Sequence, residues 1–207
     1  MKEKLTLNPW LKMWIAPRQT VKAIVQYNPK HRFYVLCAIY GFAALLHFAQ
    51  NISLGEVFSW GWILLESAIL ATVAGFVCIS LWSAILYWIG KWIGGTAPYA
   101  HIRAAIAWTN VTAIVSGLAW LGLAANFGTC LFFSDFPEMN FLGLDLAVVS
   151  TLFFVQSVMA VWSFVLTIKS LSEVQGFSSW KALLNIVLPF LLLMGVMWMI
   201  SWIVNLT

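Results

Sequence analysis

The sequence predicts an all-α, polytopic membrane protein in which a bundle of five transmembrane helices follows N-terminal amphipathic helices. Three observations predict this fold class. The 207 residues are 62% apolar and only 9% charged, with a mean hydropathy of +0.91, which lies outside the range of soluble domains. Five apolar runs are each long enough to cross the roughly 30 Å hydrocarbon core of a bilayer. The basic residues are confined to alternate segments between those runs.

The apolar runs define the expected spans and the division of the chain. The spans are residues 33–50, 60–90, 105–126, 144–168 and 183–204. Helices are the expected form, because backbone polar groups in lipid must find their partners within the segment. We therefore divide the chain into an N-terminal cytoplasmic segment, residues 1–32, and a transmembrane domain, residues 33–207.

The second run is longer than one span requires. A helix over residues 60–90 would measure about 46 Å at 1.5 Å per residue, well over the thickness of the hydrocarbon core. We expect a tilted helix that protrudes at one end, and the alternative is a short re-entrant piece before a normal span. Gly75 is the candidate bend point within this run.

The distribution of charge predicts the orientation of the chain. Seven of the eleven Lys and Arg residues lie before residue 33, two lie at 91–103 and two at 169–181. The segments between them carry acidic residues instead, which are Glu56, Asp135, Glu138 and Asp145. Because cytoplasmic loops carry the excess of Lys and Arg, we expect the N-terminus in the cytoplasm and the C-terminus outside.

The N-terminal segment has the pattern of two short amphipathic helices. Asn8-Pro9 reads as an N-cap followed by proline at the first helical position, and Pro17 begins the second helix. The candidate residues for contact with a membrane or a partner are Trp10, Leu11, Trp14, Ile15, Arg18 and Lys22. One interpretation places both helices on the cytoplasmic leaflet, with the cations toward lipid phosphates. The other packs them beneath the bundle, and the two interpretations are compatible.

Polar residues inside the spans give a candidate intramembrane site. Glu66 lies well inside an apolar run, whereas Asp145 stands at the very start of one, and His47 falls at a similar depth to Glu66 near the outer end of the first span. A carboxylate and an imidazole at one cavity would suit a proton-coupled transporter or channel. Solvated or structural roles are favoured, because both residues lie only a few positions from the outer interface. The uncharged polar residues of the later spans are interpreted as interhelical hydrogen-bonding groups.

Patterns of enzyme chemistry are absent from the sequence. It contains no nucleophile elbow, no His-Glu-x-x-His and no phosphate-binding glycine loop followed by lysine. Cys37, Cys78 and Cys130 lack the spacing of a zinc site and are interpreted as inert thiols. We therefore expect no enzyme activity, no cofactor and no metal. The basic residues form no sustained patch, so nucleic acid is not an expected partner.

Several short motifs, taken in order along the chain, resemble the hallmarks of one family. They are Asn8-Pro9-Trp10 with Ala16-Pro17-Arg18-Gln19-Thr20, then Asn28-Pro29, the loop residues Gly94 and Gly95 leading to Arg103-Ala104-Ala105-Ile106-Ala107-Trp108, and Gln175-Gly176-Phe177-Ser178. Their order and spacing resemble the bacterial branch of the YIP family, membrane proteins named for their interaction with Ypt/Rab GTPases. The Asp-Leu-Tyr-Gly-Pro motif and the long N-terminal region of the eukaryotic members are absent. Rab binding is therefore not carried over.

This resemblance implies a non-enzymatic integral membrane protein of a bacterial inner membrane. The family is linked in eukaryotes to trafficking and membrane shaping. The expected function is accordingly membrane organisation through lipid and protein contacts, with the bilayer, other membrane proteins or a second copy of the chain as partners. The alternative function is a small transporter or channel that uses Glu66 and His47.

Overall fold

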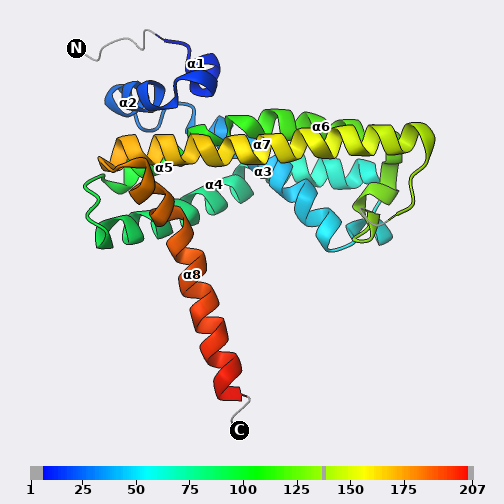
Figure 1. Cartoon of the computed structure of the whole chain (residues 1–207). Coiled ribbons are helices and arrows are strands. Elements are labelled where there is room, and N and C mark those ends of the chain that lie inside the picture. Colours follow the sequence, from blue (N-terminus) through cyan, green and yellow to red (C-terminus); the bar gives the residue numbers. More distant parts are fainter. Residues whose placement is uncertain (1–6, 137–138, 205–207) are drawn as a thin grey trace. The chain divides into compact units, whose positions relative to one another are not determined.

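The computed structural model describes residues 7–136 and 139–204, and every regular element within them is helical, as expected. The α-helices are α1 (Pro9–Ile15), α2 (Pro17–Tyr27), α3 (Phe33–Asn51), α4 (Trp60–Trp92), α5 (Tyr99–Thr109), α6 (Ala113–Phe127), α7 (Gly143–Gln175) and α8 (Ser179–Val204) (Figure 1). The 3₁₀ turns are η1 (Leu54–Glu56), η2 (Asn110–Thr112) and η3 (Gly128–Phe132). Three charged residues used above, Lys2, Lys4 and Glu138, lie outside the described residues.

Five of the described helical segments are long and apolar enough to cross a membrane, which confirms the expected number of spans. The second is one unbroken α-helix of 33 residues, α4, rather than a re-entrant piece followed by a span. The third begins earlier than the sequence predicted and covers Tyr99–Phe132. It is interrupted at Asn110–Thr112 by the 3₁₀ turn η2, which is tighter than an α-helix and marks a local irregularity.

The chain forms two compact units, which we describe separately. Unit 1 comprises Met1–Lys30, Ser80–Ile106 and Leu166–Thr207, and unit 2 comprises His31–Ile79 and Ala107–Val165. The helices α4, α5 and α7 each contribute one part to each unit.

Unit 2 has an aromatic core at the end where α3, α4 and α6 meet η1 and η3. Leu46, Ile63 and Phe136 are buried there. Trp120 stacks on Phe132, with ring centroids 6.2 Å apart and an interplanar angle of 14°. Burial of large apolar and aromatic side chains stabilises this end of the unit.

Small residues allow α3 and α4 to approach closely within unit 2. A Cβ atom on Gly75 would overlap the carbonyl oxygen of Cys37 and lie 2.7 Å from its carbonyl carbon, and one on Gly41 would overlap the carbonyl oxygen of Ala71. The spacing of four residues between Cys37 and Gly41, and between Ala71 and Gly75, therefore produces packing within the chain. Gly75 serves this approach, and α4 continues through it as a single helix.

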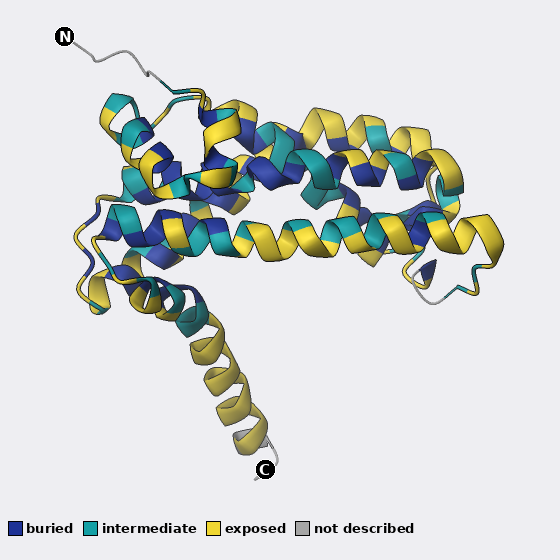
Figure 2. Cartoon of the chain, turned by 45° about the horizontal axis from the view of Figure 1, so that its top comes forward, coloured by how far each residue is buried: buried dark blue, intermediate teal, exposed yellow. Residues whose placement is uncertain are grey.

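In unit 1, each N-terminal helix buries one of its faces, whereas α8 is exposed along most of its length. Met13 of α1 and Val21 and Ile24 of α2 are fully or almost fully buried. The part of α8 that follows Pro189 exposes large apolar side chains on every face (Figure 2). A helix that is apolar all round and not covered by protein is suited to lipid.

Candidate functional site

The first candidate site is the pair of N-terminal helices. Asn8 caps α1 as predicted, because its Oδ1 accepts a hydrogen bond of 3.1 Å from the backbone N–H of Trp10. Pro9 and Met13 are buried, whereas Leu11 and Ile15 are 69% and 77% exposed. Residues four apart lie on one face of a helix, so α1 faces protein with one side and presents an apolar pair on the other. Its two tryptophans, Trp10 and Trp14, are half-buried between these faces.

The two candidate basic residues of α2 make contacts within unit 1. Arg18 donates a hydrogen bond of 2.8 Å from its guanidinium to the hydroxyl of Ser179, the first residue of α8. The Nζ atom of Lys22 lies 3.8 Å from Oε1 of Glu173 near the end of α7. Both basic residues remain partly accessible, but this hydrogen bond and this ion pair join α2 to the junction between α7 and α8. The packed interpretation of the N-terminal segment therefore holds for α2 and for the buried side of α1.

The second candidate site is the glycine loop that resembles the family hallmark. Gly94 has φ +91, a conformation that glycine adopts without a steric penalty. The N–H of Gly95 donates to the carbonyl of Gly90 at 2.7 Å, and the N–H of Gly94 donates to that of Lys91 at 3.2 Å. This pair of hydrogen bonds is a Schellman motif, which ends α4. The two glycines therefore form the C-cap of α4.

The same loop encloses a buried amide from another part of the sequence. A Cβ on Gly90 would overlap Nε2 of Gln175, and a Cβ on Gly95 would overlap its Oε1. Gln175 is only 2% exposed, and the neighbouring Asn185 is fully buried. Thr96 adds a long hydrogen bond of 3.5 Å from its hydroxyl to the backbone carbonyl of Gln175. We call this arrangement the Gln175 socket; in it, two motifs that lie some eighty residues apart in the sequence meet.

Arg103, the third residue of the family-motif set, belongs to an aromatic cluster in unit 1. Its guanidinium lies 5.5 Å from the ring centroid of Tyr99, and the ammonium of Lys91 lies 5.5 Å from that of Tyr87. The two tyrosine rings pack edge to face at 6.2 Å, and the Tyr99 hydroxyl donates to the carbonyl of Ser80 at 3.0 Å. Cation–π contact of this kind holds Arg103 beside Tyr99 at the start of α5, and Lys91 beside Tyr87 on α4.

The third candidate, Glu66 with His47, is not joined in the described structure. Both residues are exposed in unit 2, and no hydrogen bond or ion pair between them is recorded among the described residues. His47 instead packs edge to face on Trp120, with centroids 6.1 Å apart. Glu66 is not among the residues that line the pocket described below. These observations do not favour the transporter hypothesis.

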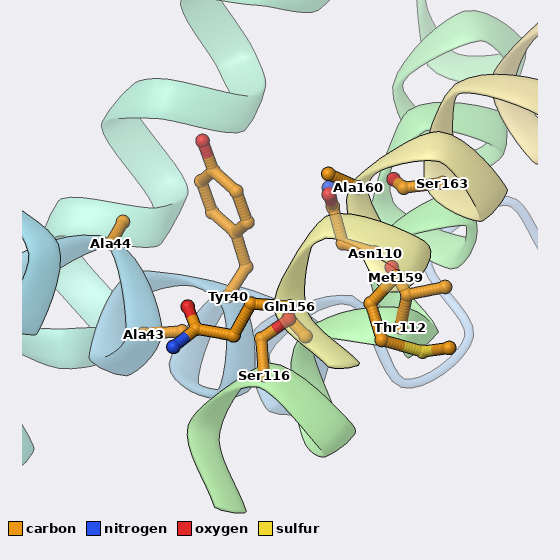
Figure 3. Close-up of a pocket in the computed structure, with 11 residues that line it drawn as sticks. Tyr40, Ala43, Ala44, Asn110, Thr112, Ser116, Gln156, Met159, Ala160 and Ser163 are labelled. Atoms are coloured by element: carbon orange, nitrogen blue, oxygen red, sulfur yellow. The ribbon is translucent and has the colours of Figure 1, made fainter. Parts of the chain in front are cut away.

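A fourth site, which the sequence reasoning missed, is a polar pocket within unit 2. Its volume is about 230 Å³, and it opens to the surface of the protein. It is lined by residues of α3, η2, α6 and α7, namely Tyr40, Ala43, Ala44, Asn110, Thr112, Ala113, Ser116, Gln156, Met159, Ala160 and Ser163 (Figure 3). Its polar members from the later spans are those that the sequence indicates as interhelical hydrogen-bonding groups, namely Asn110, Thr112, Ser116, Gln156 and Ser163. Their spacing was a usable signal, because Thr112 and Ser116 are four residues apart and Gln156 and Ser163 are seven apart.

One amide in this pocket has an unsatisfied donor. Nε2 of Gln156 is buried and has no hydrogen-bond partner in the described structure, and the amide extends toward the α3 side of the pocket, where Ala43 lies (Figure 3). A buried donor without a partner costs about 1–3 kcal/mol, and such groups in native proteins require an explanation.

The fold and these sites define an α-helical, polytopic membrane protein that carries no cluster of three His, Cys, Asp or Glu side chains suited to a metal among its described residues. The Yip1 domain model matches residues 11–200, and the chain belongs to this family. The match covers most of α1, all of α2, the glycine loop, the Gln175 socket and nearly all of the five spans. No curated protein and no solved structure gives a significant match.

Proposed function

We propose that the protein is a non-enzymatic organiser of the bacterial inner membrane that binds the lipid surface and protein partners through the exposed face of α1. The observation that carries the proposal is the division of α1 into a buried and an exposed apolar face. Met13 is 0% exposed, whereas Leu11 and Ile15 extend away from the protein. Two exposed aliphatic side chains on a short helix that precedes the first span in the sequence are suited to insertion at the headgroup boundary.

The basic residues around α1 support an anionic surface as the contact. Lys12 is exposed on the helix itself, and Arg18, Lys22 and Lys30 are exposed nearby. Each cation close to an anionic cytoplasmic leaflet adds about 1 kcal/mol of attraction. In the proposal the N-terminus is cytoplasmic, because the positive-inside rule assigns segments rich in Lys and Arg to that side.

The test measures the environment of single positions on α1 in lipid nanodiscs. The variants Leu11→Cys, Ile15→Cys and Gln19→Cys each carry an environment-sensitive fluorophore, in a background with Cys78 and Cys130 replaced by alanine. Gln19 is the matched control, because it is exposed but polar and lies on α2. We expect the probes at 11 and 15 to show blue-shifted emission and quenching by headgroup-labelled lipid, more strongly in phosphatidylglycerol than in phosphatidylcholine. Emission at 11 and 15 as water-like as at 19 would refute lipid contact by α1.

A further inference from the structure

In a bilayer crossed by the five spans, the polar pocket of unit 2 would lie at the depth of the hydrocarbon core. Tyr40 is seven residues from the start of α3, Asn110 eleven from the start of α5, and Gln156 thirteen from the start of α7. At 1.5 Å per residue these positions are about 10, 16 and 20 Å from the helix ends. Polar groups from three spans therefore gather where the bilayer offers no water, and polar groups at such depth mark binding sites or pathways in membrane proteins.

The chemistry of the lining restricts what the pocket binds. The described residues that line it carry hydroxyl and amide groups but no charge. A phosphate or an ammonium group would enter without a counter-ion, at the high cost of an isolated charge in an apolar medium. Uncharged groups with oxygen acceptors match the lining, because the unpaired Nε2 of Gln156 is a donor.

The size and surroundings of the pocket favour a lipid over a water-soluble molecule. A volume of about 230 Å³ equals that of about eight water molecules at 30 Å³ each, which is comparable to a glycerol ester or a single substituted ring. On α7 near the pocket, Phe154, Val158 and Val161 are exposed apolar residues, as expected of a surface that meets acyl chains. Lipids with uncharged headgroups reach this depth, whereas charged headgroups remain at the interface.

We propose that this pocket binds the uncharged, oxygen-bearing headgroup of a membrane lipid, of the diacylglycerol or isoprenoid-quinone class. Nε2 of Gln156 is enclosed in this structure, so on binding the Gln156 side chain turns into the pocket and its amide donates a hydrogen bond to a carbonyl or hydroxyl oxygen of the headgroup. Tyr40 contributes to the α3 wall, the Ser116 hydroxyl lies on the α6 wall, and the acyl or isoprenoid tail leaves through the open side. The irregular turn η2 shapes the third wall, which carries Asn110 and Thr112.

The test uses the full-length protein in nanodiscs of phosphatidylethanolamine and phosphatidylglycerol with a photoactivatable diacylglycerol at about 1% of lipid. After irradiation, labelled peptides are located by mass spectrometry. We expect labelling to concentrate on peptides that contain Tyr40, Asn110 or Gln156, and to fall at least fivefold in Gln156→Leu. Ala160→Phe fills the pocket without removing a polar group and lowers labelling to the same degree. Ser157→Ala is the control, because Ser157 neighbours Gln156 but is exposed and does not line the pocket.

Competition separates the two lipid classes. Unlabelled dioleoylglycerol as the better competitor assigns the site to diacylglycerol, and decylubiquinone as the better competitor assigns it to a quinone headgroup. Equal labelling in the wild type and in both pocket variants, with melting temperatures within 2 °C of each other, would overturn the proposal. So would labelling spread evenly over the spans, competition by phosphatidylcholine as strong as by either neutral lipid, or a crosslink from the pocket to a second copy of the chain.

Discussion

The substitution Gly75→Ala tests whether backbone contact between α3 and α4 holds unit 2 together. The added Cβ would lie 2.7 Å from the carbonyl carbon of Cys37 and 3.0 Å from its Cα, whereas carbon atoms in contact are normally about 3.5–4.0 Å apart. The two helices must therefore separate by about 1 Å, because the obstructing atoms are backbone and no side chain can rotate away.

Two effects of opposite sign set the magnitude. Overpacking of this kind costs about 1–3 kcal/mol, and alanine is about 0.8–1.0 kcal/mol better than glycine inside a helix. Since rigid backbone is displaced, we expect the upper part of the first range and a net loss of about 1–2 kcal/mol in the free energy of unfolding. Gly61→Ala on α4 and Gly195→Ala on α8 are matched controls, because a Cβ at either site meets no atom within 4 Å.

The assay is unfolding in mixed micelles with increasing mole fraction of sodium dodecyl sulfate, followed by fluorescence of the 13 tryptophans and by circular dichroism. Gly75→Ala should unfold at a lower fraction of dodecyl sulfate than the wild type, and both controls at the same or a higher fraction. If all three variants unfold together, the close approach of α3 and α4 does not contribute to stability and the reasoning is wrong.

Three further predictions concern other parts of the molecule. Gly95→Ala should lower the free energy of unfolding by about 1–3 kcal/mol, because the added Cβ occupies the space of the Gln175 amide. The same micelle titration measures this change, and an unchanged midpoint would contradict a stabilising role of the Gln175 socket. Cys130 is exposed in η3, so a membrane-impermeant maleimide added to the side opposite the N-terminus should label it while the membrane is intact. Labelling of Cys130 only after the membrane is permeabilised would contradict the proposed orientation. Burial, and then the charge of Arg32, lower the pKa of His31, so the folded state binds fewer protons than the unfolded state. The free energy of unfolding should therefore fall as the pH drops through 6.5 and level off below the folded-state pKa. Melting temperatures measured between pH 7.5 and 5.0 should fall less in His31→Gln than in the wild type. An identical pH profile in the variant would contradict this role of His31.

The contacts of α2 also affect how the N-terminal segment must be tested. Deleting residues 1–28 would uncover the surface that now packs against Val21 and Ile24, and would remove the hydrogen bond from Arg18 to Ser179. A loss of function after that deletion would mix lost contacts with lost packing. Point substitutions on the exposed face of α1 leave this packing in place and give the clearer result.

The sequence by itself determined the class of protein, the number of spans and the start of each N-terminal helix. The reason is that these depend on local properties: a span needs a minimum length of apolar residues, and Asn8-Pro9 or Pro17 begins a helix through its own backbone chemistry. The family followed from motifs along the chain and was confirmed by the match to the Yip1 domain.

The tertiary structure decided which of these residues meet. Gln175 lies against Gly90 and Gly95, and Gln156 of α7 shares a pocket with Tyr40 of α3 and Asn110 of η2. These groupings depend on the rotation and axial register of one helix against another. Register is fixed by packing between segments that are distant in the sequence, so hydropathy and spacing within one segment do not carry it. For the same reason, the sequence identified Leu11 and Ile15 as apolar, and only the packing of Met13 revealed that they face away from the protein.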